Sequence, residues 1–214
     1  MRNISMNKIE PKKNCIKCVR LSNFRKENTL KYPAYFNKPV SSFGSLASEL
    51  LIVGLAPGTH GANKTGRPFT GDYAGILLYE TLIKYKLATG NYLSDSTDNL
   101  KLNNCRITNA VKCVPPKNKP NSVEISNCRE FLKKEISCME NLKVILCLGT
   151  VAHNSILNCF DLKLIDFKFS HGKNHRINKK IKLFNSYHCS RYNTNTKRLS
   201  ISMFEDVFKM ITYC

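Results

Sequence analysis

Residues 51–72 read Leu51-Ile-Val-Gly-Leu-Ala-Pro-Gly-Thr-His-Gly-Ala-Asn-Lys-Thr-Gly-Arg-Pro-Phe-Thr-Gly-Asp72. The stretch opens as a continuous apolar run of the kind found in strands that are buried on both faces. It continues as a loop rich in glycine and proline, and a pattern with Leu78, Leu82 and Tyr85 at helical spacing follows at once. Ligands bind at the carboxyl ends of strands in open parallel sheets, so this loop is predicted to form a binding site.

Strands and helices alternate along the rest of the chain. Apolar runs predict strands at 50–56, 106–111, 144–148 and 181–187. The predicted helices cover 15–28, 74–86, 123–138, 151–159 and 198–213. This order predicts a single domain, residues 1–214, with a three-layer α/β/α fold and a central, mostly parallel four-stranded sheet. Residues 1–14 are polar and basic, and we expect them to form a flexible arm.

The chain is strongly basic. It contains 34 Lys and Arg against 15 Asp and Glu, a formal net charge of +19. Such a charge favours a polyanionic partner, most simply nucleic acid, although heavy use of lysine throughout the chain is the alternative explanation. No apolar run is long enough to span a bilayer, and the N-terminus lacks the apolar core of a signal peptide. We therefore expect a cytoplasmic protein without a membrane partner.

Four of the ten cysteines have the spacing of metal ligands. Cys15 and Cys18 form a Cys-x2-Cys knuckle, and Cys113 and Cys128 are separated by fourteen residues. Four thiolates from two distant segments are able to hold one zinc ion or one iron–sulfur cluster, and the spacing does not separate the two. Four ordinary buried cysteines are the alternative, which the charged neighbours of the knuckle disfavour.

Three motifs together resemble the uracil-DNA glycosylase superfamily, and in particular its family 5, the B-type enzymes related to the iron–sulfur family 4. The motifs are Gly54 to Asp72, Ile107-Thr-Asn-Ala-Val-Lys-Cys113 and Tyr187-His-Cys-Ser-Arg-Tyr-Asn-Thr-Asn-Thr-Lys-Arg-Leu199, preceded by the knuckle. Family 4 enzymes carry an acid after the first glycine of the first motif. Leu55 stands there in this chain, which favours family 5.

The resemblance implies a monomeric DNA repair glycosylase that hydrolyses the bond between sugar and base in DNA containing uracil or another deaminated base, and leaves an abasic site. It also implies a structural [4Fe–4S] cluster on Cys15, Cys18, Cys113 and Cys128, and no catalytic metal. The residues expected to contact the base are Gly54, Ala56, Phe69, Asn109 and His188. Phe69 would provide the surface on which the flipped base stacks.

The resemblance also assigns the catalytic residues. Asp72 would handle the attacking water, and Asn63 is the second polar candidate in the same loop. Asp72 precedes a helix, however, and helix capping is the competing explanation. His188 would stabilise charge on the leaving base. Cys189 is not expected to act as a nucleophile, because its side chain and that of His188 point to opposite faces of an extended segment.

A second group of residues is expected to contact DNA around the base. Arg191 and Tyr192 lead a loop that would wedge into the duplex, for which a solvated turn is the alternative. The full set comprises Arg67, Ser190, Arg191, Tyr192, Asn193 and Lys197. Two other functions compete with the glycosylase. One is a non-catalytic nucleic-acid-binding module with a structural metal site on the four cysteines, and the other is an iron–sulfur electron carrier. The compact glycine-rich loop disfavours the first, and the positive charge disfavours the second.

Overall fold

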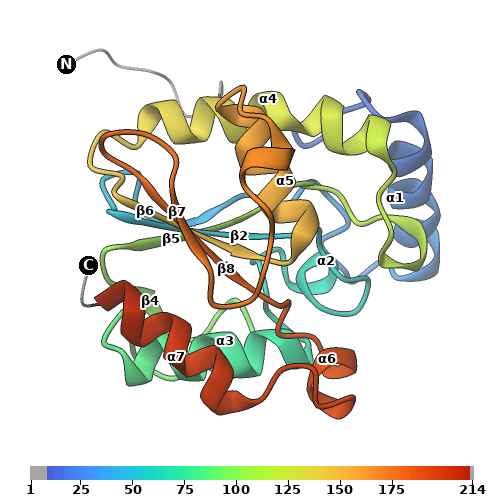
Figure 1. Cartoon of the computed structure of the whole chain (residues 1–214). Helices are drawn as coiled ribbons and strands as arrows, with labels where there is room; N and C mark the ends of the chain where they lie inside the picture. The colour runs from blue at the N-terminus through green and yellow to red at the C-terminus, as the bar shows by residue number, and fades with distance from the viewer. Residues whose placement is uncertain (1–8, 213–214) are drawn as a thin grey trace.

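The computed structural model describes residues 9–212, which form a twisted sheet between two layers of helices (Figure 1). The sheet has six strands in the order β1-β5-β2-β6-β8-β7. Their bounds are β1 Phe43–Gly44, β2 Leu50–Gly54, β5 Cys105–Asn109, β6 Val144–Leu148, β7 Asn174–Arg176 and β8 Lys182–Ser186. The four inner strands are parallel, whereas β1 and β7 pair antiparallel at the two edges. The mostly parallel α/β architecture is confirmed.

The prediction of four strands was wrong, because it missed both edges of the sheet. The edge strands β1 and β7 have two and three residues, and β7 has no fully buried residue. Strands so short and so exposed leave no apolar run to detect. For the same reason, the predicted strands and helices leave out a small hairpin between residues 88 and 102. This hairpin pairs β3, Ala88–Thr89, with β4, Lys101–Leu102.

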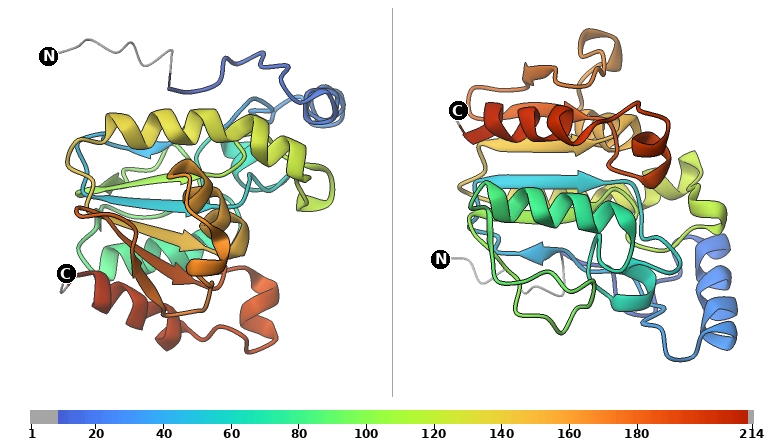
Figure 2. Two further views of the ribbon diagram at one scale, coloured as in Figure 1. Left: turned by 45° about the horizontal axis from the view of Figure 1, so that its top comes forward. Right: turned by 90° about the horizontal axis from the view of Figure 1, so that it is seen from below.

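The helices cover both faces of the sheet (Figures 1 and 2). On one face lie α3 (Tyr73–Lys84) and α7 (Ile201–Thr212), and on the other lie α4 (Ser122–Cys138) and α5 (Thr150–Cys159). The remaining α-helices are α1 (Val19–Lys31) and the short α2 (Ala62–Thr65) and α6 (Arg191–Asn195), all near the carboxyl ends of the inner strands. No helix within residues 9–212 has the length and apolar character needed to cross a membrane.

Each helical layer has its own hydrophobic core. The α3–α7 side buries Leu78 and Phe204 against the sheet, and the α4–α5 side buries Leu132 and Ile156. All five residues of β2, β5 and β6 are buried, because these strands are covered on both faces. The inner strands are therefore rigid, and they fix the positions of the loops that follow them.

The N-terminal segment is docked against the sheet as far as it is described. Residues 1–8 lie outside the described part of the chain. Within 9–14, the Glu10 carboxylate accepts a hydrogen bond from the Ser42 amide at 2.9 Å and lies 3.3 Å from the Lys112 amine. Lys112 is buried, so its charge requires a nearby carboxylate. Glu10 is therefore held by these contacts, and the flexible arm expected for residues 1–14 stays a prediction.

Candidate active site

One cavity lies at the carboxyl edge of the sheet, where the chain leaves β2, β5 and β8. Gly54 ends β2 and is paired with Asn109, which ends β5. His188 follows the end of β8 by two residues. The residues lining the cavity are Ala56, Gly58, Ala62, Phe69, Asp72, Ala74, Asn109 and His188. Five of the residues predicted from the sequence thus surround a single space.

Phe69 is held in an unusual backbone conformation. Its φ of 54° lies in the left-handed region, which bulky residues rarely adopt. The Tyr92 hydroxyl donates to the Phe69 carbonyl at 3.2 Å, and the Tyr79 hydroxyl donates to the Pro68 carbonyl at 2.6 Å. The Phe69 ring lies nearly parallel to that of His188, with 5.8 Å between the ring centroids. Strain of this kind is retained where the surrounding structure enforces it, often at functional sites.

The absence of a side chain at Gly54 keeps the cavity compact. A Cβ atom there would collide with the Asn109 side-chain oxygen and with the Phe69 ring. The amide and the ring are therefore packed directly over the backbone at the end of β2. This close approach explains why the first motif requires glycine at this position.

Asp72 uses its two carboxylate oxygens differently. Oδ1 accepts a hydrogen bond from the Gly75 amide at 3.2 Å, which caps the N-terminus of α3. Oδ2 faces the loop after β2, since a Cβ at Gly58 would lie 3.2 Å from it and a Cβ at Gly61 would collide with it. Asp72 also borders an open groove that includes Tyr32. Capping and a role in chemistry are thus compatible in one side chain.

His188 faces the same cavity from the other side. Its burial lowers the pKa of the imidazole, and the charge of Asp72 partly opposes this shift. The Asn193 side chain donates to the His188 carbonyl at 2.8 Å and thereby holds the segment. The next residue, Cys189, is fully buried with its sulfur 3.4 Å from the Ala74 carbonyl, and burial raises the pKa of its thiol well above the usual range. A neutral thiol facing the core is no nucleophile.

Asn63 does not line the cavity. It lies in α2 and is fully buried, and its amide donates to the Asn37 side-chain oxygen at 2.8 Å. The structure therefore directs Asn63 to the segment that precedes β1, away from the space between Phe69 and His188. Its contacts are those of a residue that positions the loop.

The guanidinium of Arg67, which was expected to contact DNA, is buried in an ion pair. Its side chain is 7% exposed, and two of its nitrogens lie 2.6 and 2.7 Å from the Asp98 carboxylate. The group also donates to the Asp95 carbonyl and to the Thr70 hydroxyl. Arg67 thus ties the glycine-rich loop to the 95–98 segment.

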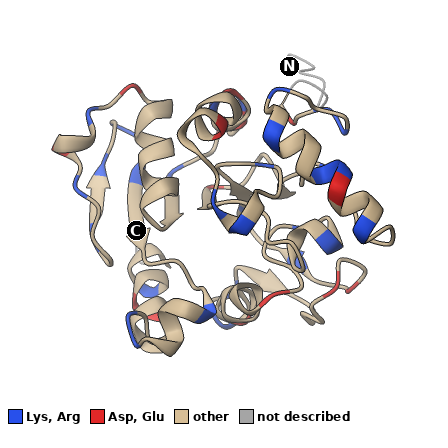
Figure 3. Ribbon diagram, turned by 90° about the vertical axis from the view of Figure 1, so that its right-hand side faces the viewer, with Lys and Arg blue, Asp and Glu red and all other residues tan. Residues whose placement is uncertain are grey.

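The residues after Cys189 divide into internal and exposed groups. Ser190 caps α6, because its hydroxyl oxygen accepts a hydrogen bond from the backbone amide of Asn193 at 3.4 Å. Both residues therefore make hydrogen bonds within the chain. Arg191, Tyr192 and Lys197 are exposed, Tyr192 by 72%. Lys and Arg outnumber acidic residues on the ribbon at this end of the molecule (Figure 3). The exposed group is available to contact DNA.

The four motif cysteines lie around one small cavity. Cys15 and Cys18 precede and cap α1, Cys113 follows β5, and Cys128 lies in α4. Burial raises the pKa of Cys113 to about 12 and that of Cys128 to about 11. Within residues 9–212, no three His, Cys, Asp or Glu side chains are arranged to hold a metal ion.

Some residues of the site could not be found by sequence reasoning. Ala62 and Ala74 line the cavity, but an alanine beside a motif carries no chemical signal. Tyr92 supports Phe69 from a polar segment 23 residues further along the chain. Its only signal is an aromatic residue in a stretch otherwise typical of a surface loop.

Comparison with known proteins gives consistent matches. The family model of the uracil DNA glycosylase superfamily matches residues 41–212 of this chain. The chain is 37% identical over 198 residues to the type-5 uracil-DNA glycosylase of Thermus thermophilus, covering 90% of each chain. It is 34% identical over 203 residues to the type-5 uracil-DNA glycosylase of Pyrobaculum aerophilum, covering 92% of this chain and 87% of that relative. A type-4 uracil-DNA glycosylase of Archaeoglobus fulgidus is 33% identical over 153 residues, 70% of this chain.

Proposed function

The chain belongs to the uracil-DNA glycosylase superfamily, and from this we propose that it is a DNA repair enzyme that removes uracil or another deaminated base from DNA. It hydrolyses the N-glycosidic bond of the flipped nucleotide and leaves an abasic site. The observation that carries the proposal is the cavity at the carboxyl edge of the sheet, where Phe69, Asp72, Asn109 and His188 meet. A binding module without chemistry has no need of such a cavity.

The base is recognised by stacking and by its polar edge. The flipped base stacks on Phe69, which contributes about 1–3 kcal/mol. Asn109, held at the end of a buried strand, contacts the polar edge of the base with its amide. His188 meets the charge that develops on the leaving base, where a positioned donor contributes about 3–4 kcal/mol. The lowered pKa keeps its imidazole neutral at pH 7, so it can donate one N–H without adding a buried charge.

Asp72 acts on the water. The water oxygen bonds to the sugar carbon, the bond from that carbon to the base breaks, and the electron pair leaves with the base. The proton released by the water passes to the Asp72 carboxylate, whose charge also stabilises the cationic sugar. The oxygen that faces Gly58 and Gly61 is suited to this role, because the other oxygen is occupied by the cap of α3.

The four cysteines support a structural [4Fe–4S] cluster. The observation that supports it is that the four thiols surround one apolar cavity, although no group of three side chains that could hold a metal ion is present among the described residues. Such a cluster would tie α1 to α4 and to the segment after β5, and it has no part in the reaction. Protein purified without oxygen should contain about four irons; one zinc and no iron would reject the cluster alone.

The experiment for the enzymatic proposal uses a duplex with one U·G mismatch. Incubation with the protein, followed by alkali, should cleave the uracil strand at the position of the mismatch. A matched duplex with C·G at that position serves as the control. If the protein binds the duplex but the uracil strand stays intact after prolonged incubation with excess protein, the protein is a binding module and not an enzyme.

A further inference from the structure

A second hollow, of about 450 Å³, lies at the edge of the sheet opposite the base cavity. It opens at the amino ends of the inner strands, since Leu50, Val144 and Lys182, the first residues of β2, β6 and β8, all line it. A five-residue strand is about 17 Å long. The hollow is therefore separated from the base cavity by the length of the sheet, and the reaction proposed above gives it no role.

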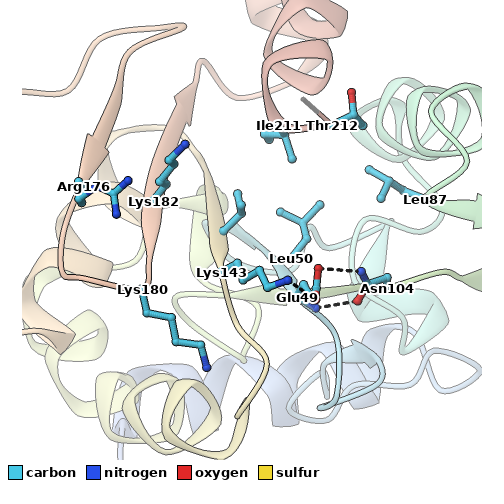
Figure 4. A pocket seen from close by; sticks show the side chains of 11 residues that line it. Glu49, Leu50, Leu87, Asn104, Lys143, Arg176, Lys180, Lys182, Ile211 and Thr212 are labelled. Atoms are coloured by element: carbon cyan, nitrogen blue, oxygen red, sulfur yellow. Dashed lines mark hydrogen bonds and ion pairs between the residues drawn. The ribbon is translucent and has the colours of Figure 1, made fainter. Parts of the chain in front are cut away.

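Cations dominate the lining of this hollow. Lys143, Arg176, Lys180 and Lys182 line it, against one carboxylate, Glu49. Lys143 lies 2.6 Å from that carboxylate, so the single acid is already paired. In Figure 4, Arg176 and Lys182 lie side by side on one wall, while Lys180 extends away. A partly enclosed space with this excess of positive charge attracts anions.

The opposite wall of the hollow is mainly apolar, with Asn104 and Thr212 as its polar members. Figure 4 shows Leu50, Leu87 and Ile211 facing the cations across the open space. The volume falls within the range of about 300–1,000 Å³ that is usual for sites that bind small molecules. A ligand that satisfies both walls has an anionic end and a flat or compact apolar body.

We propose that this hollow binds a mononucleotide, with the phosphate against Arg176 and Lys182 and the base against the apolar wall. A guanidinium provides paired N–H donors that match phosphate oxygens, and the ammonium groups add charge. An inorganic anion would leave the apolar wall unused, and a nucleoside without phosphate would leave the cationic wall unused. The site is separate from the one that acts on DNA.

Isothermal titration of the whole protein with AMP, adenosine and inorganic phosphate tests this assignment. AMP should bind saturably with one site per chain, at least about tenfold more tightly than either fragment, because each fragment satisfies one wall only. The variant that combines Arg176→Gln with Lys182→Gln should weaken AMP binding about tenfold, as expected for the loss of two charge contacts. Combining Lys168→Gln with Lys173→Gln removes the same charge from exposed positions outside the lining of the hollow, and should leave binding unchanged.

Three outcomes would overturn the proposal. They are the absence of saturable AMP binding to the wild-type protein, equal weakening by the two charge-matched variants, and phosphate binding as tight as that of AMP. Circular dichroism establishes that each variant is folded. The Asp72→Asn variant should still bind AMP, and the Arg176 and Lys182 variant should still excise uracil. A negative binding result therefore leaves the proposed enzymatic function untouched, and a failure of excision leaves this site untouched.

Discussion

Asp72 caps α3, and a single substitution separates this structural role from the proposed role in catalysis. Asn caps helices about as well as Asp, so Asp72→Asn should keep the hydrogen bond to the Gly75 amide and the stability of the fold. It removes the carboxylate that accepts the proton of the water. The single-turnover excision rate should fall by roughly 10²–10⁴, the range for loss of a general base.

Asp72→Ala completes this test. It should show the same loss of rate and should also lower the free energy of unfolding by about 1 kcal/mol, because the cap is lost. Urea unfolding measures the second effect. If Asp72→Asn excised uracil at the wild-type rate, Asp72 would be a helix cap and nothing more.

His188 gives the stability of the protein a defined dependence on pH. Burial places the pKa of His188 in the folded protein below its ordinary value of 6.5, so the unfolded chain binds the proton more tightly. The stabilisation is complete above pH 6.5 and is lost as the pH falls toward the folded pKa. Wild type should therefore lose more stability than His188→Gln between pH 7 and pH 5, as measured by urea unfolding.

The pKa values of His171 and His175 are also lowered by burial, and both residues are present in the two proteins compared. Their contribution cancels in the difference. Identical losses of stability for wild type and His188→Gln on acidification would mean that His188 is not buried as described.

At the scale of elements, the ion pair between Arg67 and Asp98 connects the glycine-rich loop to the segment before β4. The Asp98 side chain is fully buried, so Arg67→Met leaves a carboxylate without its partner. The expected cost is about 3–5 kcal/mol in the free energy of unfolding. The salt dependence of DNA binding should not change, because Arg67 neutralises no phosphate.

Lys197→Met is the matched control, since Lys197 is exposed at the DNA end of the molecule. Its loss should leave stability within about 0.5 kcal/mol of wild type. It should reduce the steepness of the log–log salt dependence by about 0.9 if one phosphate contact is removed. A reversed pattern, with Arg67→Met changing the salt dependence and not the stability, would restore the original assignment of Arg67 to DNA.

The inner strands and the main helices were predictable because an element that is buried on one or both faces requires apolar residues at regular positions in its sequence. The strand β6 matches its predicted range, and β2, β5 and β8 differ by one or two residues at their ends. The edge strands β1 and β7 and the hairpin β3–β4 carry too few residues for any pattern. Their pairing is set by tertiary contacts, which a single sequence does not express.

The site was partly predictable for a related reason. Phe69 and Asp72 stand in a distinctive loop, His188 follows a predicted strand, and Asn109 lies within another predicted strand. Parallel topology therefore brings them to one edge of the sheet. An arginine in such a loop looks the same whether it pairs with a phosphate or with a carboxylate 31 residues away, as Arg67 does with Asp98. The direction in which a polar side chain points and the extent of its burial, as for Asn63, depend on the folded structure and cannot be predicted from the sequence.

At the scale of the whole molecule, the two edges of the sheet have different characters. The carboxyl edge carries the base cavity, the four cysteines and the exposed Arg191, Tyr192 and Lys197. We therefore propose that DNA approaches this face. The amino edge carries the basic hollow. The net charge of +19 is therefore not an argument for DNA contact over the entire surface. At the carboxyl edge, however, exposed basic side chains lie at the same edge as the base cavity.

The most direct test of the active site is the single-turnover release of uracil from a U·G duplex by wild type and by a double variant, Asp72→Asn with His188→Gln. Both proteins should fold and should bind the duplex with similar affinity, because neither side chain neutralises a phosphate. Wild type should release uracil, and the double variant should be slower by at least about 10³, since two groups that act on one transition state are lost. A double variant that releases uracil at the wild-type rate would contradict the assignment of catalysis to the carboxyl edge of the sheet.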